Sequence, residues 1–82
     1  MISPEQIATY IRATMPDARV TAFDTTGTRD HWRVQVISEA FRARNLLDCH
    51  RMVQKALAEP MADGRIHALE LQTELPVGQV GR

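Results

Sequence analysis

Few side chains in this sequence could do chemistry: three histidines, His31, His50 and His67, and one cysteine, Cys49. Imidazole nitrogens bind borderline metals, including the iron of clusters that mix cysteine and histidine ligands. The sequence contains no C-x-x-C pair, no zinc spacing of Cys and His, no G-x-S-x-G motif and no glycine loop for phosphate. Metal ligation by histidine is therefore the main chemistry that these residues allow. We expect no enzymatic activity.

Two of the histidines each allow two interpretations. His67 lies early in an alternating apolar segment, where it is either a half-buried ring bonded to a neighbouring carbonyl or a metal ligand. His31 follows Asp30, whose carboxylate can hold an imidazole in one tautomer, and simple exposure to solvent is the other interpretation. His31 becomes a plausible second ligand only if the two rings converge.

The remaining candidates favour packing or a solvated surface. Cys49 and His50 are adjacent on a predicted helix, so their side chains diverge by about 100° and cannot easily chelate one metal. The arginines at positions 42, 44 and 51 could form a local basic face for nucleic acid. However, ten basic residues balance ten acidic ones, whereas proteins that bind phosphates usually have a basic excess.

Five elements must position these residues. Ser3, Pro4 and Gln6 predict the capped start of a helix that ends before Pro16. Alternation predicts strands over residues 19–23 and 31–38, joined by a hairpin loop over residues 24–30. A second helix begins after Asn45 and stops or kinks at residues 59–60, and residues 66–73 form a third strand with Ile66 and His67 on opposite faces. The expected apolar stripes of the two helices contain Ile7, Tyr10, Ile11 and Thr14, and then Leu46, Cys49, His50, Val53, Ala56 and Leu57.

This order predicts an α+β fold in two layers, a three-stranded mixed sheet with helices on one face. The strands over residues 31–38 and 66–73 should be parallel if they are neighbours, because a helix connects them. His31 and His67 each begin one of these strands. We therefore expect the two histidines at the same end of the sheet.

Several motifs then resemble the BolA family, in order and spacing, over residues 5–76. The residues are Ser38-Glu39-Ala40-Phe41, His50-Arg51-Met52-Val53 with Ala56-Leu57, Ile66-His67-Ala68-Leu69, and Thr73-Glu74-Leu75-Pro76. The family pattern is V-S-x-x-F, then H-R/Q-x-V-x-x-A-L, then an apolar residue before H-A-L and a closing T-x-T-P. This sequence departs from it at Ile37, where the pattern has Val, and at Leu75, where it has the second Thr. Asp30-His31-Trp32 is similar to the entry into the second strand of some bacterial members.

The resemblance implies a class II KH-like order, α-β-β-α-α-β, with two helices where the pattern above gives one. It also implies a partner, a monothiol (CGFS-type) glutaredoxin, with which such proteins share a [2Fe-2S] cluster and glutathione. His67 matches the histidine ligand of the family. Many relatives provide a second ligand, Cys or His, from the loop before the second strand, where residues 25–30 contain neither and His31 is the nearest substitute.

Other functions stay open at this point. A nucleic-acid-binding transcriptional regulator could use a KH-like surface with Arg42, Arg44 and Arg51, although the G-x-x-G loop of KH domains is missing. A regulator that binds glutaredoxin without metal is a third possibility. We expect no cluster in the isolated chain, a monomer or weak homodimer, a cytoplasmic location without membrane insertion, one domain over residues 1–76, and a flexible tail over residues 77–82.

Overall fold

The computed structural model describes residues 2–76, and the tail expected over residues 77–82 lies outside the described residues. Helix α1 (Pro4–Arg12) begins as predicted: the Ser3 hydroxyl accepts a hydrogen bond from the Gln6 amide at 3.1 Å, and the Gln6 side chain accepts one from the Ser3 amide at 2.9 Å. The helix ends at its C-cap, Ala13. Thr14, expected on the apolar stripe, was wrongly placed there, because it lies beyond the helix and is exposed.

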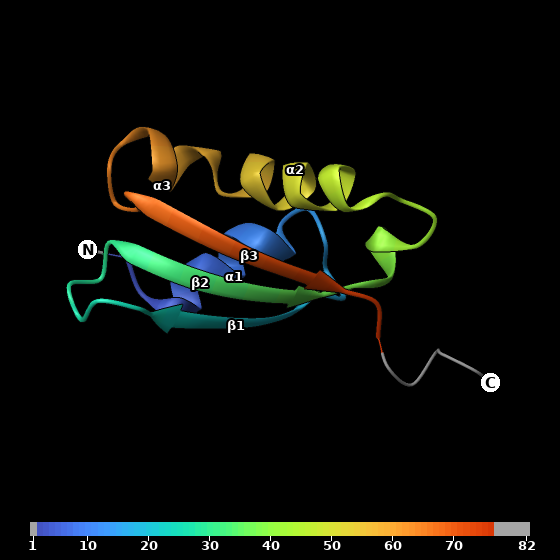
Figure 1. The fold of residues 1–82 in the computed structure, drawn as a ribbon, viewed down its shortest axis with the longest axis horizontal. Coiled ribbons are helices and arrows are strands. Elements are labelled where there is room, and N and C mark those ends of the chain that lie inside the picture. Colours follow the sequence, from blue (N-terminus) through green and yellow to red (C-terminus); the bar gives the residue numbers. More distant parts are fainter. Residues whose placement is uncertain (1, 77–82) are drawn as a thin grey trace.

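The sheet has the predicted topology. Strands β1 (Arg19–Asp24), β2 (His31–Ile37) and β3 (Ala68–Glu74) lie in the order β1-β2-β3, with β1 antiparallel and β3 parallel to β2 (Figure 1). The register pairs His31 with Ala68. Figure 1 shows β2 and β3 beginning at the same end of the molecule, beside the loop that follows β1.

The middle of the chain differs from the helix predicted from the sequence. After a short 3-10 helix (Glu39–Phe41), α2 (Leu46–Ala56) is followed by a separate helix, α3 (Ala58–Ala62), as the KH-like order implied. The break falls at Leu57, with φ −101° and ψ 17°, and not at residues 59–60. Pro60 lies in the first turn of α3, where a residue without an amide hydrogen is tolerated because that donor has no partner within the helix.

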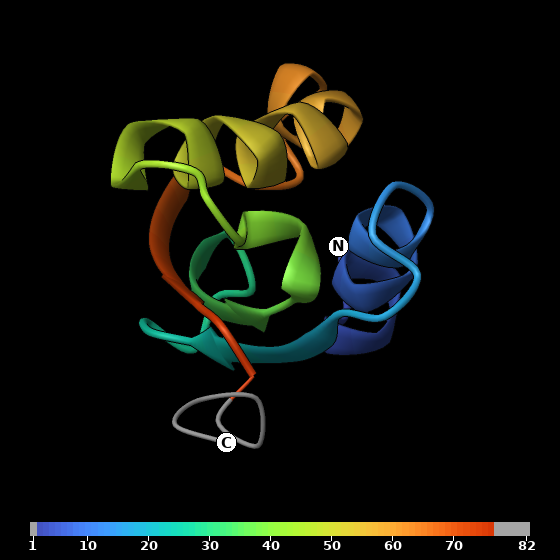
Figure 2. The ribbon, with the colours of Figure 1, turned by 90° about the vertical axis from the view of Figure 1, so that its right-hand side faces the viewer.

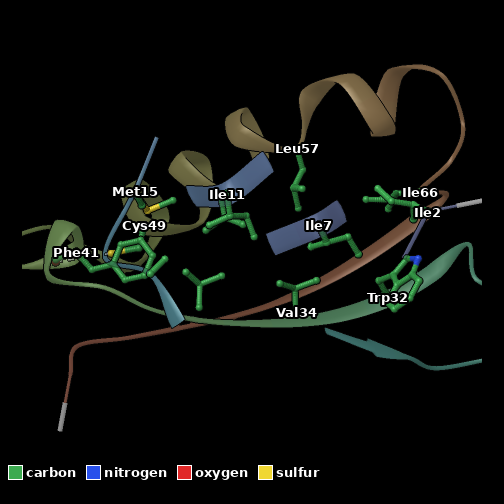
Figure 3. Packing of buried hydrophobic residues seen from close by; sticks show 13 residues of the cluster. Ile2, Ile7, Ile11, Met15, Trp32, Val34, Phe41, Cys49, Leu57 and Ile66 are labelled. Atoms are coloured by element: carbon green, nitrogen blue, oxygen red, sulfur yellow. Dashed lines mark hydrogen bonds between the residues drawn. The ribbon is translucent and has the colours of Figure 1, made fainter. Parts of the chain in front are cut away.

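Both layers meet in one apolar core. Figure 2 shows α1 and α2 on the same side of the sheet, and Figure 3 shows the side chains packed between them. Trp32, Val34 and Val36 face this core, as the alternation predicts, and Cys49 is packed within it at 6% exposure. Leu46 was wrongly assigned to the apolar stripe: it is 65% exposed, since the packed part of α2 begins only at Cys49. No helix within residues 2–76 is long and apolar enough to cross a membrane.

The last strand begins two residues later than expected. Ile66 was predicted on the face opposite His67 and shared with polar residues, but its side chain is 2% exposed and packs in the core near Trp32 (Figure 3). The reason is the turn that precedes β3, in which the Ile66 amide donates to the Pro60 carbonyl at 3.0 Å. His67 therefore lies between a buried anchor and the first residue of the strand.

Candidate metal-ligating site

The parallel register brings the two candidate histidines together. The His67 amide donates to the Asp30 carbonyl at 2.7 Å, which ties the turn before β3 to the start of β2. The imidazole ring centroids of His31 and His67 are 6.3 Å apart, and the ring planes are nearly perpendicular, at 88°. The predicted placement of both histidines at the same end of the sheet is confirmed, and the two rings lie close together.

The Asp30 carboxylate links both rings. Its Oδ1 lies 2.9 Å from Nδ1 of His31, and its Oδ2 lies 3.2 Å from Nδ1 of His67. The Thr28 hydroxyl also donates to Oδ1. This hydrogen bond, together with the one from His31, lowers the pKa of Asp30 to about 2. The carboxylate is thus ionised near neutral pH and can only accept hydrogen bonds.

The bridging carboxylate fixes the tautomer of His31 and favours the same tautomer in His67. Because Asp30 has no proton to give, Nδ1 of His31 carries the hydrogen of their hydrogen bond, and the negative charge 3.2 Å from Nδ1 of His67 favours a hydrogen on that nitrogen as well. Nε2 of each neutral ring then keeps its lone pair. A carboxylate bonded to the far nitrogen is the usual support of a metal-ligating histidine, because it fixes ring orientation and raises ligand basicity. The arrangement is therefore chemically suited to present two Nε2 atoms to a metal.

Both rings are reachable from outside. The side chain of His67 is 62% exposed and that of His31 is 42% exposed. The interpretation of His67 as a half-buried ring bonded to a carbonyl is thus wrong. His31 is accessible but not free, since its Nδ1 is engaged by Asp30.

The loop before β2 holds Asp30 in place. Asp24 accepts hydrogen bonds from the amides of Gly27 at 2.9 Å and Arg29 at 3.2 Å. Gly27 adopts φ +80°, a left-handed conformation that glycine reaches without steric cost. The Trp32 indole donates to the Arg29 carbonyl at 3.1 Å and anchors the end of the loop to the core.

The described residues do not enclose a metal by themselves. Within residues 2–76, no group of three or more His, Cys, Asp or Glu side chains is arranged to hold a metal ion. One oxygen of Asp30 is hydrogen-bonded to His31 and the other lies 3.2 Å from Nδ1 of His67, so this carboxylate faces the two rings and is not placed as a third ligand. A [2Fe-2S] cluster needs four protein or thiolate ligands, so two imidazoles fit it only if another molecule supplies the rest.

The other candidates lie elsewhere. The segment with Arg42 and Arg44 joins the far end of β2 to α2, opposite the histidines (Figure 1). Arg42 forms two hydrogen bonds with Glu39, at 2.7 and 2.9 Å, and Arg44 donates to the Ala40 carbonyl at 3.1 Å. Arg51 is exposed on α2. Part of the expected basic face is thus neutralised within the chain.

The role of Asp30 at His67 is the main feature that the sequence interpretation missed. The neighbouring Asp30-His31 pair indicated a tautomer-fixing contact for one ring only. The second contact follows from the parallel register, which places the turn before β3 against the Asp30 backbone. The register and the adjacent carboxylate together were the signal that could have found it.

Comparison with known proteins decides the family. A family model described as BolA-like protein matches residues 7–77. The chain belongs to the BolA family. Protein BOLA2 from Arabidopsis thaliana is 33% identical over 73 residues, which cover 88% of this chain and 76% of that protein. A BolA-like protein of Dictyostelium discoideum is 32% identical over 50 residues, or 61% of this chain, and the match spans only 44% of its length.

Solved structures agree with the family assignment. A BolA homologue from Coxiella burnetii is 30% identical, with a TM-score of 0.75 and coverage of 93% of this chain and 94% of that one. BolA1 from Arabidopsis thaliana shares the fold with a TM-score of 0.79 at 21% identity, over 93% of this chain and 95% of that one. The α+β fold, with its three-stranded mixed sheet and helices on one face, is thus that of the BolA family.

Proposed function

We propose that this BolA-family protein is a non-enzymatic, cytoplasmic partner of a monothiol (CGFS-type) glutaredoxin. In this proposal it supplies Nε2 of His67, and Nε2 of His31 as the second ligand, to a [2Fe-2S] cluster shared with the glutaredoxin and glutathione. The observation that supports it most directly is the Asp30 carboxylate, which contacts Nδ1 of both exposed rings. A histidine with only a packing role would be buried, whereas the side chain of His67 is 62% exposed.

The chemistry of imidazole suits cluster transfer or iron sensing. Replacing thiolates with neutral imidazoles removes negative charge from a cluster and raises its reduction potential. An imidazole can also be protonated, so it can leave the metal more readily than a thiolate.

The ligand count explains why a partner is required. Two imidazoles leave two of the four positions of a [2Fe-2S] cluster to be filled from outside. A glutaredoxin thiolate and a glutathione thiolate would complete the set. The isolated chain is therefore expected to be colourless after purification.

The test is anaerobic cluster reconstitution of the chain with a monothiol glutaredoxin and glutathione. His67→Ala should change the visible absorption and circular dichroism of the complex, because one nitrogen ligand is lost. His31→Ala should do so separately if His31 is the second ligand. His50→Gln is the matched control, since His50 lies on α2 away from the site. An unchanged spectrum with His67→Ala would remove His67 from the ligand set.

Iron analysis separates this proposal from a metal-free regulator. The complex isolated under anaerobic conditions should contain about two iron atoms per cluster-bridged pair of proteins. A stable complex that never retains iron, even after reconstitution, would favour regulation of glutaredoxin by protein contact alone.

A further inference from the structure

A hollow of about 300 Å³ lies beside His67. One wall is formed by residues 28–30 of the loop before β2, and the other by residues 63–65 and His67 of the turn before β3. The hollow thus opens next to the candidate metal ligand. Its chemical character depends on which of its charged groups are already engaged.

Both carboxylates of the hollow are already engaged. Asp30 accepts hydrogen bonds from Thr28 and His31, and its Oδ2 lies 3.2 Å from Nδ1 of His67. Asp63 accepts from Nε of Arg65 at 2.9 and 3.1 Å through its two oxygens. Neither carboxylate is thus in need of a further cation.

The cations are less completely engaged. The Arg65 guanidinium uses Nε for Asp63 and Nη2 for the Tyr10 hydroxyl at 2.9 Å, and it lies 5.6 Å from the Tyr10 ring centre. The Arg29 guanidinium has neither a hydrogen-bond nor an ion-pair partner within the described part of the chain, residues 2–76. Its backbone, however, is fixed by Asp24 and by Trp32. Arg29 also has φ +61°, an uncommon conformation for a residue other than glycine.

The hollow lies beside Nε2 of His67, the nitrogen proposed to bind the metal. Gly64 adopts φ +85°, and a Cβ atom at this position would lie 3.7 Å from Nε2 of His67. Any longer side chain at residue 64 would crowd this nitrogen. A group bound between Arg29 and Arg65 would therefore lie next to whatever Nε2 of His67 binds.

We infer that this hollow binds a carboxylate, with Arg29 as the principal cation and Arg65 as an anchored second one. Guanidinium groups pair with carboxylates through two parallel hydrogen bonds, which makes them suited to this ligand. The carboxylate would come from a molecule that reaches the cluster beside His67, either the thiol peptide glutathione or an acidic side chain of the glutaredoxin. This biological role depends on the proposed function, whereas carboxylate binding itself does not.

The first experiment measures carboxylate binding to the chain alone. S-methylglutathione has the two carboxylates of glutathione but no free thiol. Its dimethyl ester has no free thiol and no free carboxylate. Titration followed by amide NMR at low salt should shift the signals of residues 29, 64, 65 and 67 with the acid and not with the ester. Arg29→Gln should weaken this binding about threefold or more, whereas Arg19→Gln, the same change at the far end of the sheet, should leave it unaltered.

The second experiment identifies the source of the carboxylate. The affinity of apo-glutaredoxin for the chain is measured without glutathione, for wild type, Arg29→Gln and Arg19→Gln. If Arg29→Gln lowers the affinity for apo-glutaredoxin and Arg19→Gln does not, the carboxylate belongs to the glutaredoxin. If Arg29→Gln lowers only the affinity for S-methylglutathione in the first experiment, the carboxylate belongs to the peptide. If Arg29→Gln behaves like Arg19→Gln in both experiments, the site is refuted. That result would leave the proposed function intact, which fails instead if His67→Ala does not change the cluster spectrum.

Discussion

Replacing Asp30 with Asn tests the central physical claim about the histidine pair. In the wild type, one carboxylate accepts a hydrogen bond from Nδ1 of His31 at 2.9 Å, and its other oxygen lies 3.2 Å from Nδ1 of His67. An asparagine has a single acceptor oxygen, and its NH₂ group cannot accept from an imidazole N–H. At most one of the two rings can therefore keep its support.

The expected size of the effect follows from the loss of this support. Removing an outer partner of a metal-ligating histidine typically lowers metal affinity about 10–100-fold. Because at least one ring of the pair is affected, Asp30→Asn should weaken cluster retention in the glutaredoxin complex by about tenfold or more. The fold should persist, since Asp30 is partly exposed and its backbone carbonyl still binds the turn before β3.

Two assays check this prediction. The rate of cluster loss to a chelator, followed by visible absorption, reports retention, and nitrogen NMR of the metal-free chain reports the tautomers. In the wild type both rings should carry hydrogen on Nδ1, whereas Asp30→Asn should shift at least one ring toward the Nε2–H form. Asp48→Asn, the same charge change in the first turn of α2, is the control. Unchanged tautomers and unchanged cluster loss in Asp30→Asn would refute the reasoning.

Three further outcomes are expected. Leu57→Ala removes a fully buried side chain and should lower the free energy of unfolding in urea by about 3 kcal/mol, whereas Leu46→Ala, at an exposed position, should change it by less than about 0.5 kcal/mol. Hydrogen bonds from the Glu39 amide and then from the Ser38 hydroxyl lower the pKa of Asp17 in the folded state below its ordinary value of 3.8. The ionised carboxylate therefore stabilises the fold at pH values above 3.8, and this stabilisation is lost as the pH falls through the lowered pKa. Asp17→Asn should therefore be less stable than wild type at pH 7, and urea unfolding at pH 3 should show a smaller difference. If the chain binds DNA, reversing Arg42 and Arg44 to Glu should weaken salt-sensitive mobility shifts, and no shift at low salt would dismiss that function.

Local rules accounted for much of the fold. Ser3 and Gln6 cap α1 through contacts only three residues apart, so the sequence pattern and the structure agree. The alternation around Val34 and the short loop after β1 were likewise sufficient to predict a hairpin. The parallel placement of His31 and His67 followed from the helical connection between their strands.

The errors arose where tertiary contacts decide between local alternatives. A proline stops a helix in its interior but not in its first turn, and the break at Leu57 moves Pro60 into that turn. Alternation along the expected strand places Ile66 on the same face as Ala68 and Glu70. The turn before β3 instead directs the Ile66 side chain into the core. The contact between Asp30 and His67 depends on the position of that same turn against residue 30. The spacing of residues within a strand does not predict this contact.

The two histidines lie at the starts of two strands, β2 and β3, which are connected through α2 and α3. The hairpin of β1 and β2 contains His31 and Asp30, but the second imidazole arrives only when β3 takes its place beside β2. During synthesis on the ribosome, a nascent chain that lacks β3 would present a single supported nitrogen, which binds metal weakly. The two imidazoles are therefore brought together only after the domain has finished folding, and a metal ion could meet both of them only then.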